Sequence, residues 1–209
     1  MLEVDGLCKS YHGHQVLTPV RFVLPAGACI GITGENGAGK STLLRLLAQT
    51  ERPDGGDIRY KGDSVLGDRK FLRQKLGYVP QQSELMEELT VRQQLKLWQS
   101  ASGAEDAFPK DIMELLDIGP MLKKPVSALS GGMQKRVSIA MALMRQPEIL
   151  VMDEATTGLD PDHRERLLCW LEGYLARGGR IVWCSHDQGE LERLCGGCLH
   201  LQGGRLQEK

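Results

Sequence analysis

The fold of this chain is decided by a stretch that runs Cys29-Ile30-Gly31-Ile32-Thr33-Gly34-Glu35-Asn36-Gly37-Ala38-Gly39-Lys40-Ser41-Thr42. The first four residues are predicted to form a short buried strand, and a helix is predicted to begin at Lys40. Glycines dominate the connection between the two. A strand, a glycine-rich loop and a helix in this order fit the Walker A pattern of a phosphate-binding loop, so the sequence indicates an α/β fold built around a P-loop.

The chemistry of the loop follows from its residue types. Gly34, Gly37 and Gly39 permit backbone angles closed to other residues, so consecutive N–H groups can turn inward toward phosphate oxygens. Lys40 supplies a compact charge for the β and γ phosphates, the helix start adds its dipole, and the Ser41 hydroxyl is placed to bind Mg²⁺. A glycine-rich turn that binds nothing is the plainer alternative, and the complete spacing argues against it. The residues assigned to nucleotide binding here are Gly34, Asn36, Gly37, Ala38, Gly39, Lys40, Ser41 and Thr42.

A second motif is an apolar run that ends in two acids, Ile149-Leu150-Val151-Met152-Asp153-Glu154. Neighbouring side chains on a strand point to opposite faces unless the strand ends between them, so the two carboxylates are expected to have different roles. Asp153 is predicted to act on Mg²⁺ through water, and Glu154 to polarise the attacking water. Seen alone, the pair could be a solvated strand end. Behind a complete phosphate loop, the catalytic interpretation is favoured.

A third motif, Leu129-Ser130-Gly131-Gly132-Met133, precedes that apolar run. Ser130 is expected to cap a helix that runs to about Met144. Its hydroxyl and the N–H groups that follow would then form an outward-facing anion site.

The three motifs in this order resemble the ATP-binding cassette family, and the resemblance extends from about Leu2 to Leu206. It implies that Tyr11 stacks on adenine and that Gln81 touches Mg²⁺ and senses a membrane partner; Gln82 is the neighbouring alternative for the latter role. It also implies that Asp160 crosses a dimer interface and that His186 contacts the γ-phosphate. In the family, residues matching Ser130, Gly131 and Gly132 contact the γ-phosphate held by the opposite subunit. The resemblance thus implies Glu154, His186 and Lys40 as the catalytic set, and Ser41, Gln81 and Asp153 as the residues around the metal.

Two residues depart from the common family pattern. Met133 stands where many members have glutamine, and Ala155 stands where many have proline after the catalytic carboxylate. Neither departure removes a phosphate-contacting group. Met133 resembles the variant common in ATPase subunits of exporter-type systems, so it favours export.

The periodicity of the chain predicts its organisation as a single domain, residues 1–209. Residues 2–24 alternate as short strands broken at residues 11–14 and at Pro19, and indicate an N-terminal antiparallel β subdomain. A helical period, with Val91, Leu95 and Trp98 facing inward, indicates an inserted α-helical subdomain over about residues 82–130. After Glu154 helices and strands alternate, which predicts a mostly parallel sheet in a P-loop NTPase core.

Composition and charge limit the partners and the location that can be expected for this chain. The formal net charge is −1 over 209 residues, so no basic field attracts nucleic acid, and no nucleic-acid partner is expected. No apolar run approaches the ~18 residues that cross a bilayer, and no leader opens the chain, so a cytoplasmic protein is expected. It would lie on the inner face of the cell membrane through a partner. The six cysteines are expected to be reduced thiols for the same reason.

The resemblance therefore predicts an ATP-hydrolysing subunit that dimerises around two ATP molecules with Mg²⁺ and powers transport, export being favoured, through separate transmembrane permease subunits. The dimer could be formed with an identical chain or with another ATPase subunit of this family. The alternative is a soluble ATPase of the same family that remodels a protein or nucleic-acid complex. A P-loop kinase or GTPase is a third interpretation, but it leaves the Ser130 turn and His186 unexplained.

Overall fold

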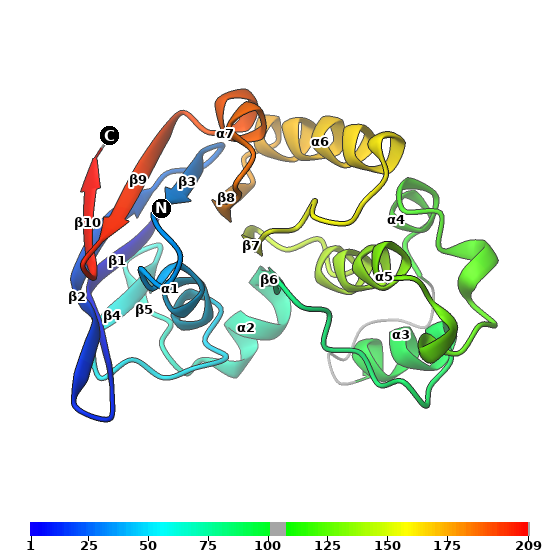
Figure 1. The fold of residues 1–209 in the computed structure, drawn as a ribbon, viewed down its shortest axis with the longest axis horizontal. Helices are drawn as coiled ribbons and strands as arrows, with labels where there is room; N and C mark the ends of the chain where they lie inside the picture. Colours follow the sequence, from blue (N-terminus) through cyan, green and yellow to red (C-terminus); the bar gives the residue numbers. More distant parts are fainter. Residues whose placement is uncertain (101–107, 209) are drawn as a thin grey trace.

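The computed structural model describes residues 1–100 and 108–208. An antiparallel sheet at the N-terminal side is packed beside a larger, mostly parallel sheet with helices on both faces (Figure 1). The strands are β1 (Leu2–Tyr11), β2 (His14–Leu24), β3 (Cys29–Thr33), β4 (Gly55–Tyr60), β5 (Asp63–Ser64), β6 (Leu76–Val79), β7 (Ile149–Asp153), β8 (Arg180–Cys184), β9 (Gly197–Gln202) and β10 (Arg205–Glu208). The helices are α1 (Lys40–Leu47), α2 (Arg69–Lys75), α3 (Val91–Ser100), α4 (Lys110–Leu115), α5 (Gly131–Leu143), α6 (Pro161–Ala176) and α7 (Gln188–Leu194), with short 3₁₀ turns at Gly119–Met121 and Val126–Ala128.

The smaller sheet has the order β2-β1-β4-β5, and each neighbouring pair in it is antiparallel. The predicted antiparallel character of this region is confirmed, but the predicted break at Pro19 is wrong, because β2 runs through it. The strand lies at the edge of this sheet, where the missing N–H of proline need not interrupt a ladder. The turn between β1 and β2 leaves Tyr11 at the end of β1.

The larger sheet has the order β10-β9-β3-β8-β7-β6. All its pairs are parallel except the terminal hairpin of β9 and β10. The strand that precedes the phosphate loop, β3, lies between β8 and β9, and β7 lies on the other side of β8. Parallel strands end at one edge, so the segments after β3, β7 and β8 meet there.

Side chains that alternate along the parallel strands fill two different cores. Ile149 and Val151 of β7 pack with α1, α2 and the smaller sheet, whereas Leu150 and Met152 pack with α5 and α6 on the opposite face. Both faces of β7 are fully buried, which explains its continuous apolar sequence. The phosphate-loop helix α1 is therefore held between the two sheets (Figure 1).

Between β6 and α5 the chain forms α3, α4 and the two 3₁₀ turns. Val91 and Leu95 are buried as predicted, but Trp98 is 38% exposed and its indole nitrogen donates to the carbonyl oxygen of Met141 at 2.9 Å. Part of the predicted helical stretch, residues 101–107, lies outside the described residues.

Two cysteines differ from the expectation of reduced thiols. Cys29, which opens β3, and Cys195, which follows α7, are joined as a disulfide in the structure. Sequence spacing could not reveal this pair because the two residues are 166 positions apart and meet only through the packing of α7 on the sheet.

Candidate active site

The phosphate loop has the backbone that its glycines predict. Gly34, Gly37 and Gly39 have φ values of 146°, 81° and 101°, in the region that favours glycine. A β-carbon on Gly34 would also collide with the carbonyl oxygen of Leu201 in β9. The loop therefore needs glycine at this position for its conformation and for its close approach to the neighbouring strand.

The lysine of the loop is held over the loop's own backbone. Lys40 is the first residue of α1, and its ammonium donates to the carbonyl oxygens of Gly34 at 2.7 Å and Glu35 at 2.9 Å. These bonds keep the positive charge at the mouth of the loop, beside the positive end of the α1 dipole. An anion at the mouth of the loop would be attracted by both the Lys40 ammonium and the α1 dipole.

A cavity of about 290 Å³ opens above the loop, at the carboxyl ends of β3, β7 and β8. It brings together residues that the sequence scatters over five segments. Its lining consists of Tyr11, Val16, Asn36, Gly37, Gly39, Lys40, Ser41, Thr42, Gln81, Asp153, Glu154, Cys184 and His186. Of the residues predicted for the loop, Gly34 and Ala38 line adjoining hollows instead.

The two acids lie on either side of the end of β7, and both line the cavity. Asp153 is the last residue of β7 and is 2% exposed. Glu154 adopts a φ of 50°, unusual for a residue with a side chain and costing on the order of 1 kcal/mol. Its N–H donates to the carbonyl oxygen of Cys184 at 2.9 Å, which fixes it to the end of β8.

Glu154 and His186, which both line this cavity, form a close pair. Glu154 Oε1 lies 3.2 Å from His186 Nε2, and Glu154 Oε2 accepts a hydrogen bond from the Thr157 hydroxyl at 3.1 Å. Beside the two carboxylates the local field is negative: burial raises the pKa of Cys184 to about 12, the charges of Asp153 and Glu154 add to that shift, and the charge of Lys40 opposes it. Such a field favours a cation in the cavity and suits a carboxylate that removes a proton.

Tyr11 also lines the cavity. Its hydroxyl donates to the carboxylate of Glu51. The same hydroxyl oxygen of Tyr11 accepts from Arg45 Nη2 at 3.5 Å. These contacts fix the ring near α1 and leave part of it exposed to the cavity. A planar base could stack there.

Gln81 is another lining residue, and a lysine that sequence inspection missed holds its backbone. Lys135 of α5 is 4% exposed, and its ammonium donates to the carbonyl oxygens of Pro80 at 2.9 Å and Gln81 at 2.7 Å. Burial lowers the pKa of Lys135, and the charges of Asp153 and Glu154 oppose that shift. Nothing in the local pattern of the α5 sequence separates Lys135 from a surface lysine.

The remaining predicted residues lie outside this cavity. Ser130 is exposed and caps α5, its hydroxyl accepting from the Met133 N–H at 3.4 Å. Gly131 and Gly132 begin the helix, and a β-carbon on Gly132 would collide with the carbonyl oxygen of Gly158. Asp160 caps α6 and contacts His163 Nδ1 at 2.7 Å. The Ser130 turn is therefore an exposed helix start that takes no part in lining the cavity above the phosphate loop.

The donor set in the cavity fits a hard divalent cation. Ser41 offers a hydroxyl, Asp153 a buried carboxylate and Gln81 an amide oxygen, and all three line the same hollow. Oxygen donors of this kind, with space left for water and phosphate, are what Mg²⁺ prefers.

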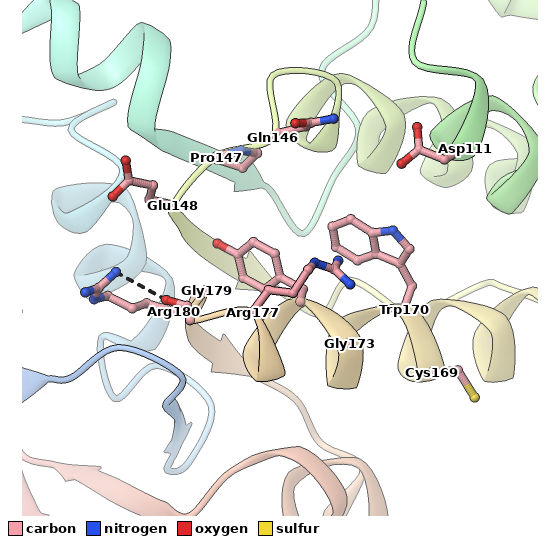
Figure 2. A pocket seen from close by; sticks show the side chains of 12 residues that line it. Asp111, Gln146, Pro147, Glu148, Cys169, Trp170, Gly173, Arg177, Gly179 and Arg180 are labelled. Carbon is pink, nitrogen blue, oxygen red and sulfur yellow. Dashed lines mark hydrogen bonds between the residues drawn. The ribbon is translucent and has the colours of Figure 1, made fainter.

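A larger hollow of about 690 Å³ lies at the opposite, amino ends of β7 and β8 (Figure 2). Trp170, Arg177, Glu148 and Arg180 surround it, and Arg180 donates to the carbonyl oxygen of Gly178 at 3.4 Å. None of the phosphate-loop or acidic residues described above lines it. The smaller cavity, which collects the predicted chemistry, is therefore the candidate active site.

The family model for ABC transporters matches residues 17–157, a segment that contains the phosphate loop, the Ser130 turn and the acidic pair. The chain belongs to the ABC transporter family. A Nod factor export ATP-binding protein I of Rhizobium etli is 36% identical over 208 residues, which cover 98% of this chain and 66% of that protein. The corresponding protein of Rhizobium sp. is 38% identical over 98% of this chain and 68% of its own length. The ABC cassette described here thus spans about two thirds of the length of these relatives, 66% in the first case.

Solved structures of ABC cassettes share the fold. An ATP-binding subunit of an ABC transporter superposes with a TM-score of 0.91 at 29% identity, over 100% of this chain and 89% of that one. A dimeric bacterial ABC transporter cassette superposes with a TM-score of 0.86 at 25% identity, over 100% of this chain and 98% of that one. The predicted fold, a mostly parallel core sheet with an antiparallel N-terminal sheet, is confirmed for this ABC cassette.

Proposed function

We propose that this ABC cassette binds ATP in the cavity above Gly34–Thr42 and hydrolyses it, with Glu154 as the general base. The observation that carries the proposal is the pair of Glu154 and His186, 3.2 Å apart, on the wall of the cavity that also holds Lys40, Ser41 and Asp153. A carboxylate beside an imidazole, facing a phosphate-binding loop, is arranged to take a proton from water and to contact the γ-phosphate.

Each residue has a distinct part in the proposed reaction. The loop amides and Lys40 bind the phosphates and neutralise charge, and Tyr11 stacks on the base. Mg²⁺, bound by Ser41 and Gln81 and approached by Asp153 through water, would supply charge neutralisation at the phosphates. Glu154 accepts a proton from the attacking water, and His186 holds the terminal phosphate and keeps the carboxylate in place.

The proposed working form is a dimer of cassettes with two ATP molecules at shared sites. The Ser130 turn is an exposed helix start outside its own chain's cavity, and such a start suits phosphate held by a second copy or by a related ATPase subunit. The similarity to a dimeric bacterial ABC transporter cassette supports this arrangement.

We further propose that the dimer drives export through separate permease subunits and sits on the inner face of the membrane through them. The names of the matched relatives, Nod factor export ATP-binding proteins, support export. In the described ranges 1–100 and 108–208, no helix is long and apolar enough to cross a bilayer. The proposal assigns the path of the transported molecule to a partner chain.

The test is Glu154→Gln, which keeps the shape of the side chain and removes the base. Hydrolysis by the purified chain is expected to fall by ~10²-fold or more, while the Kd for ATP stays within about twofold. Glu114→Gln, on the exposed surface of α4, is the matched control and should hydrolyse ATP like the wild type. Turnover near the wild-type value in Glu154→Gln would remove the proposed base. Co-purification of the tagged chain with a polytopic membrane protein tests the transport assignment, and a stable complex with only soluble proteins would favour remodelling.

A further inference from the structure

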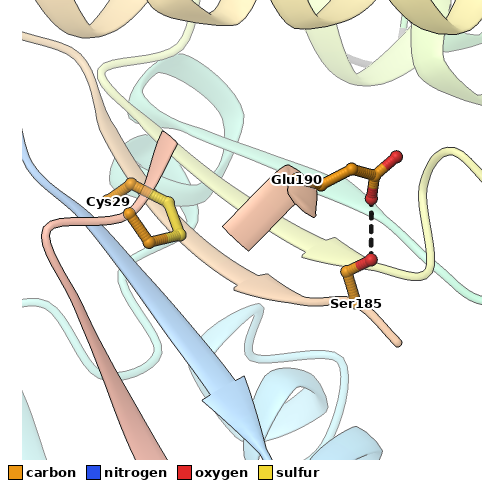
Figure 3. The surroundings of a disulfide bond; sticks show 4 residues. Cys29, Ser185 and Glu190 are labelled. Atoms are coloured by element: carbon orange, nitrogen blue, oxygen red, sulfur yellow. Dashed lines mark hydrogen bonds between the residues drawn. A yellow bond between two sulfur atoms is a disulfide. The ribbon is translucent and has the colours of Figure 1, made fainter. Parts of the chain in front are cut away.

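A carboxylate outside the nucleotide cavity joins the two segments that carry Glu154 and His186. Glu190 of α7 is 2% exposed, and its Oε2 accepts a hydrogen bond from the Ser185 hydroxyl at 2.7 Å (Figure 3). The same oxygen also accepts a hydrogen bond from the Thr156 hydroxyl at 3.0 Å. Ser185 directly precedes His186, and Thr156 is the second residue after Glu154. One buried oxygen atom therefore connects the loop after β7 to the loop after β8.

The backbone on either side of His186 is fixed to the same helix. The Asp187 N–H donates to the Ser185 hydroxyl at 3.1 Å, and the Asp187 carboxylate accepts from the Glu190 N–H at 3.1 Å as the cap of α7. The His186 side chain, by contrast, is 63% exposed and pairs with Glu154 across the cavity wall. Its position therefore depends on how firmly Ser185 and Asp187 are held.

The charge of Glu190 is compensated from a third segment. Arg164 Nε lies 2.8 Å from Glu190 Oε1, in an ion pair that is not aligned as a hydrogen bond, and Arg164 also pairs with Asp187. Arg164 is in the first turns of α6, the helix that Asp160 caps. A buried carboxylate needs such a partner, because an unpaired charge is strongly unfavourable away from water.

We propose that Glu190 is a positioning residue for ATP hydrolysis, which sets the geometry of the Glu154 and His186 pair from behind without touching the nucleotide. It does not line the cavity, and it reaches the two catalytic segments through Ser185 and Thr156. The inference rests on the proposed function, since it assigns Glu190 a part in the reaction of Glu154.

The first variant is Glu190→Gln, which keeps the volume of the side chain and removes its charge. The kcat for ATP hydrolysis is expected to fall by ~10-fold, because small displacements of catalytic groups are costly, while the KM and Kd for ATP stay within about twofold. Lys40 and the loop amides are untouched by this change. Glu192→Gln, on the exposed side of the same helix, is the matched control and should keep the wild-type kcat.

A structural role alone is separated from a positioning role by a double-mutant cycle. Removing His186 removes the pair of Glu154 and His186 whose geometry Glu190 is proposed to set, so Glu190→Gln made in a His186→Ala background should reduce kcat by less than about twofold. An equal loss in both backgrounds would overturn the proposal, as would an unchanged kcat in Glu190→Gln. Thr156→Val, which keeps the shape and deletes one hydroxyl, provides the same comparison if Glu190→Gln does not fold. If hydrolysis is lost in Glu154→Gln but unchanged in Glu190→Gln, the proposed function stands and only this inference is rejected. If the wild type hydrolyses no ATP, both are rejected.

Discussion

Lys135 of α5 holds the backbone of Gln81 in place, with its ammonium 2.7 Å from the Gln81 carbonyl oxygen. The contact joins the helix that begins at the Ser130 turn to the loop after β6, which borders the nucleotide cavity. A displacement of α5 would therefore also move the backbone of Gln81. The lysine is 4% exposed, so the link is shielded from water.

Lys135→Met is expected to destabilise the chain by ~1–3 kcal/mol, because the carbonyl oxygens of Pro80 and Gln81 lose their buried donor. Urea unfolding at neutral pH measures the effect. Lys123→Met, at an exposed position before α5, should stay within ~0.5 kcal/mol of the wild type. Equal stability of the two variants would show that the Lys135 contacts add nothing net.

Tyr11→Ala is expected to weaken ATP binding by ~1–3 kcal/mol, since the ring that faces the cavity would no longer stack on the base. Catalysis at saturating ATP should change little. Tyr11→Phe separates stacking from the hydrogen bond to Glu51, and should bind ATP within about twofold of the wild type. Titration with a fluorescent ATP analogue measures all three proteins, and unchanged affinity in Tyr11→Ala would assign the ring to packing.

Ser130→Arg should leave ATP binding by the monomer intact and block closure of the dimer, because the exposed turn lies outside the chain's own cavity. A heterodimer of Ser130→Arg with Lys40→Ala carries both changes in one shared site and neither in the other. ATP hydrolysis by the mixture should then partly recover relative to either homodimer. No recovery in verified heterodimers would reject the shared-site arrangement.

Substitution by aspartate is expected to have different effects at Met86 and at Leu85. Met86 is 52% exposed, whereas Leu85 is half-buried and packs against the core shared by α5 and α6. Met86→Asp should keep thermal stability and basal ATPase activity but reduce transport with the permease, because an exposed apolar group near Gln81 suits a partner helix. Leu85→Asp should lower the Tm by several degrees. Normal transport by Met86→Asp would show that Met86 makes no necessary contact with the permease.

Glu148 gives the fold a pH dependence that can be measured. Hydrogen bonds from Lys75 and Tyr60 lower its pKa from an ordinary 4.5 to about 2. A carboxyl whose pKa is lowered by folding stabilises the protein above its unfolded pKa, and this stabilisation is lost as the pH falls from about 4.5 toward 2.

The side chain of Glu148 is 33% exposed, so screening reduces its contribution to about 1–2 kcal/mol. Glu148→Gln should therefore be less stable than the wild type by this amount at pH 7. The difference should shrink as chemical unfolding is repeated at decreasing pH below about 5. A difference that stays constant over that range would mean that the charge of Glu148 is not its source.

The sequence by itself determined the parts that depend on local chemistry. The glycine spacing set the loop conformation, since φ values near 81° and 101° at Gly37 and Gly39 are open to few other residues. Apolar runs broken by turns predicted the parallel strands, and the Ser130 cap marked the start of α5. These signals lie within a few residues of one another, so no long-range contact was needed to interpret them.

The tertiary structure alone decided which distant residues meet. Glu190 and Lys135 look like ordinary charged helix residues in the sequence, and only the packing of α7 and α5 on the sheet buries them beside Ser185 and Gln81. The joining of Cys29 to Cys195 arises in the same way, from residues far apart in the chain. The continuation of β2 through Pro19 depends instead on its place at the edge of the smaller sheet. The periodicity of apolar residues indicates which side of a helix or strand is buried. The partner of a buried polar group, however, is set by how the helices and strands pack together.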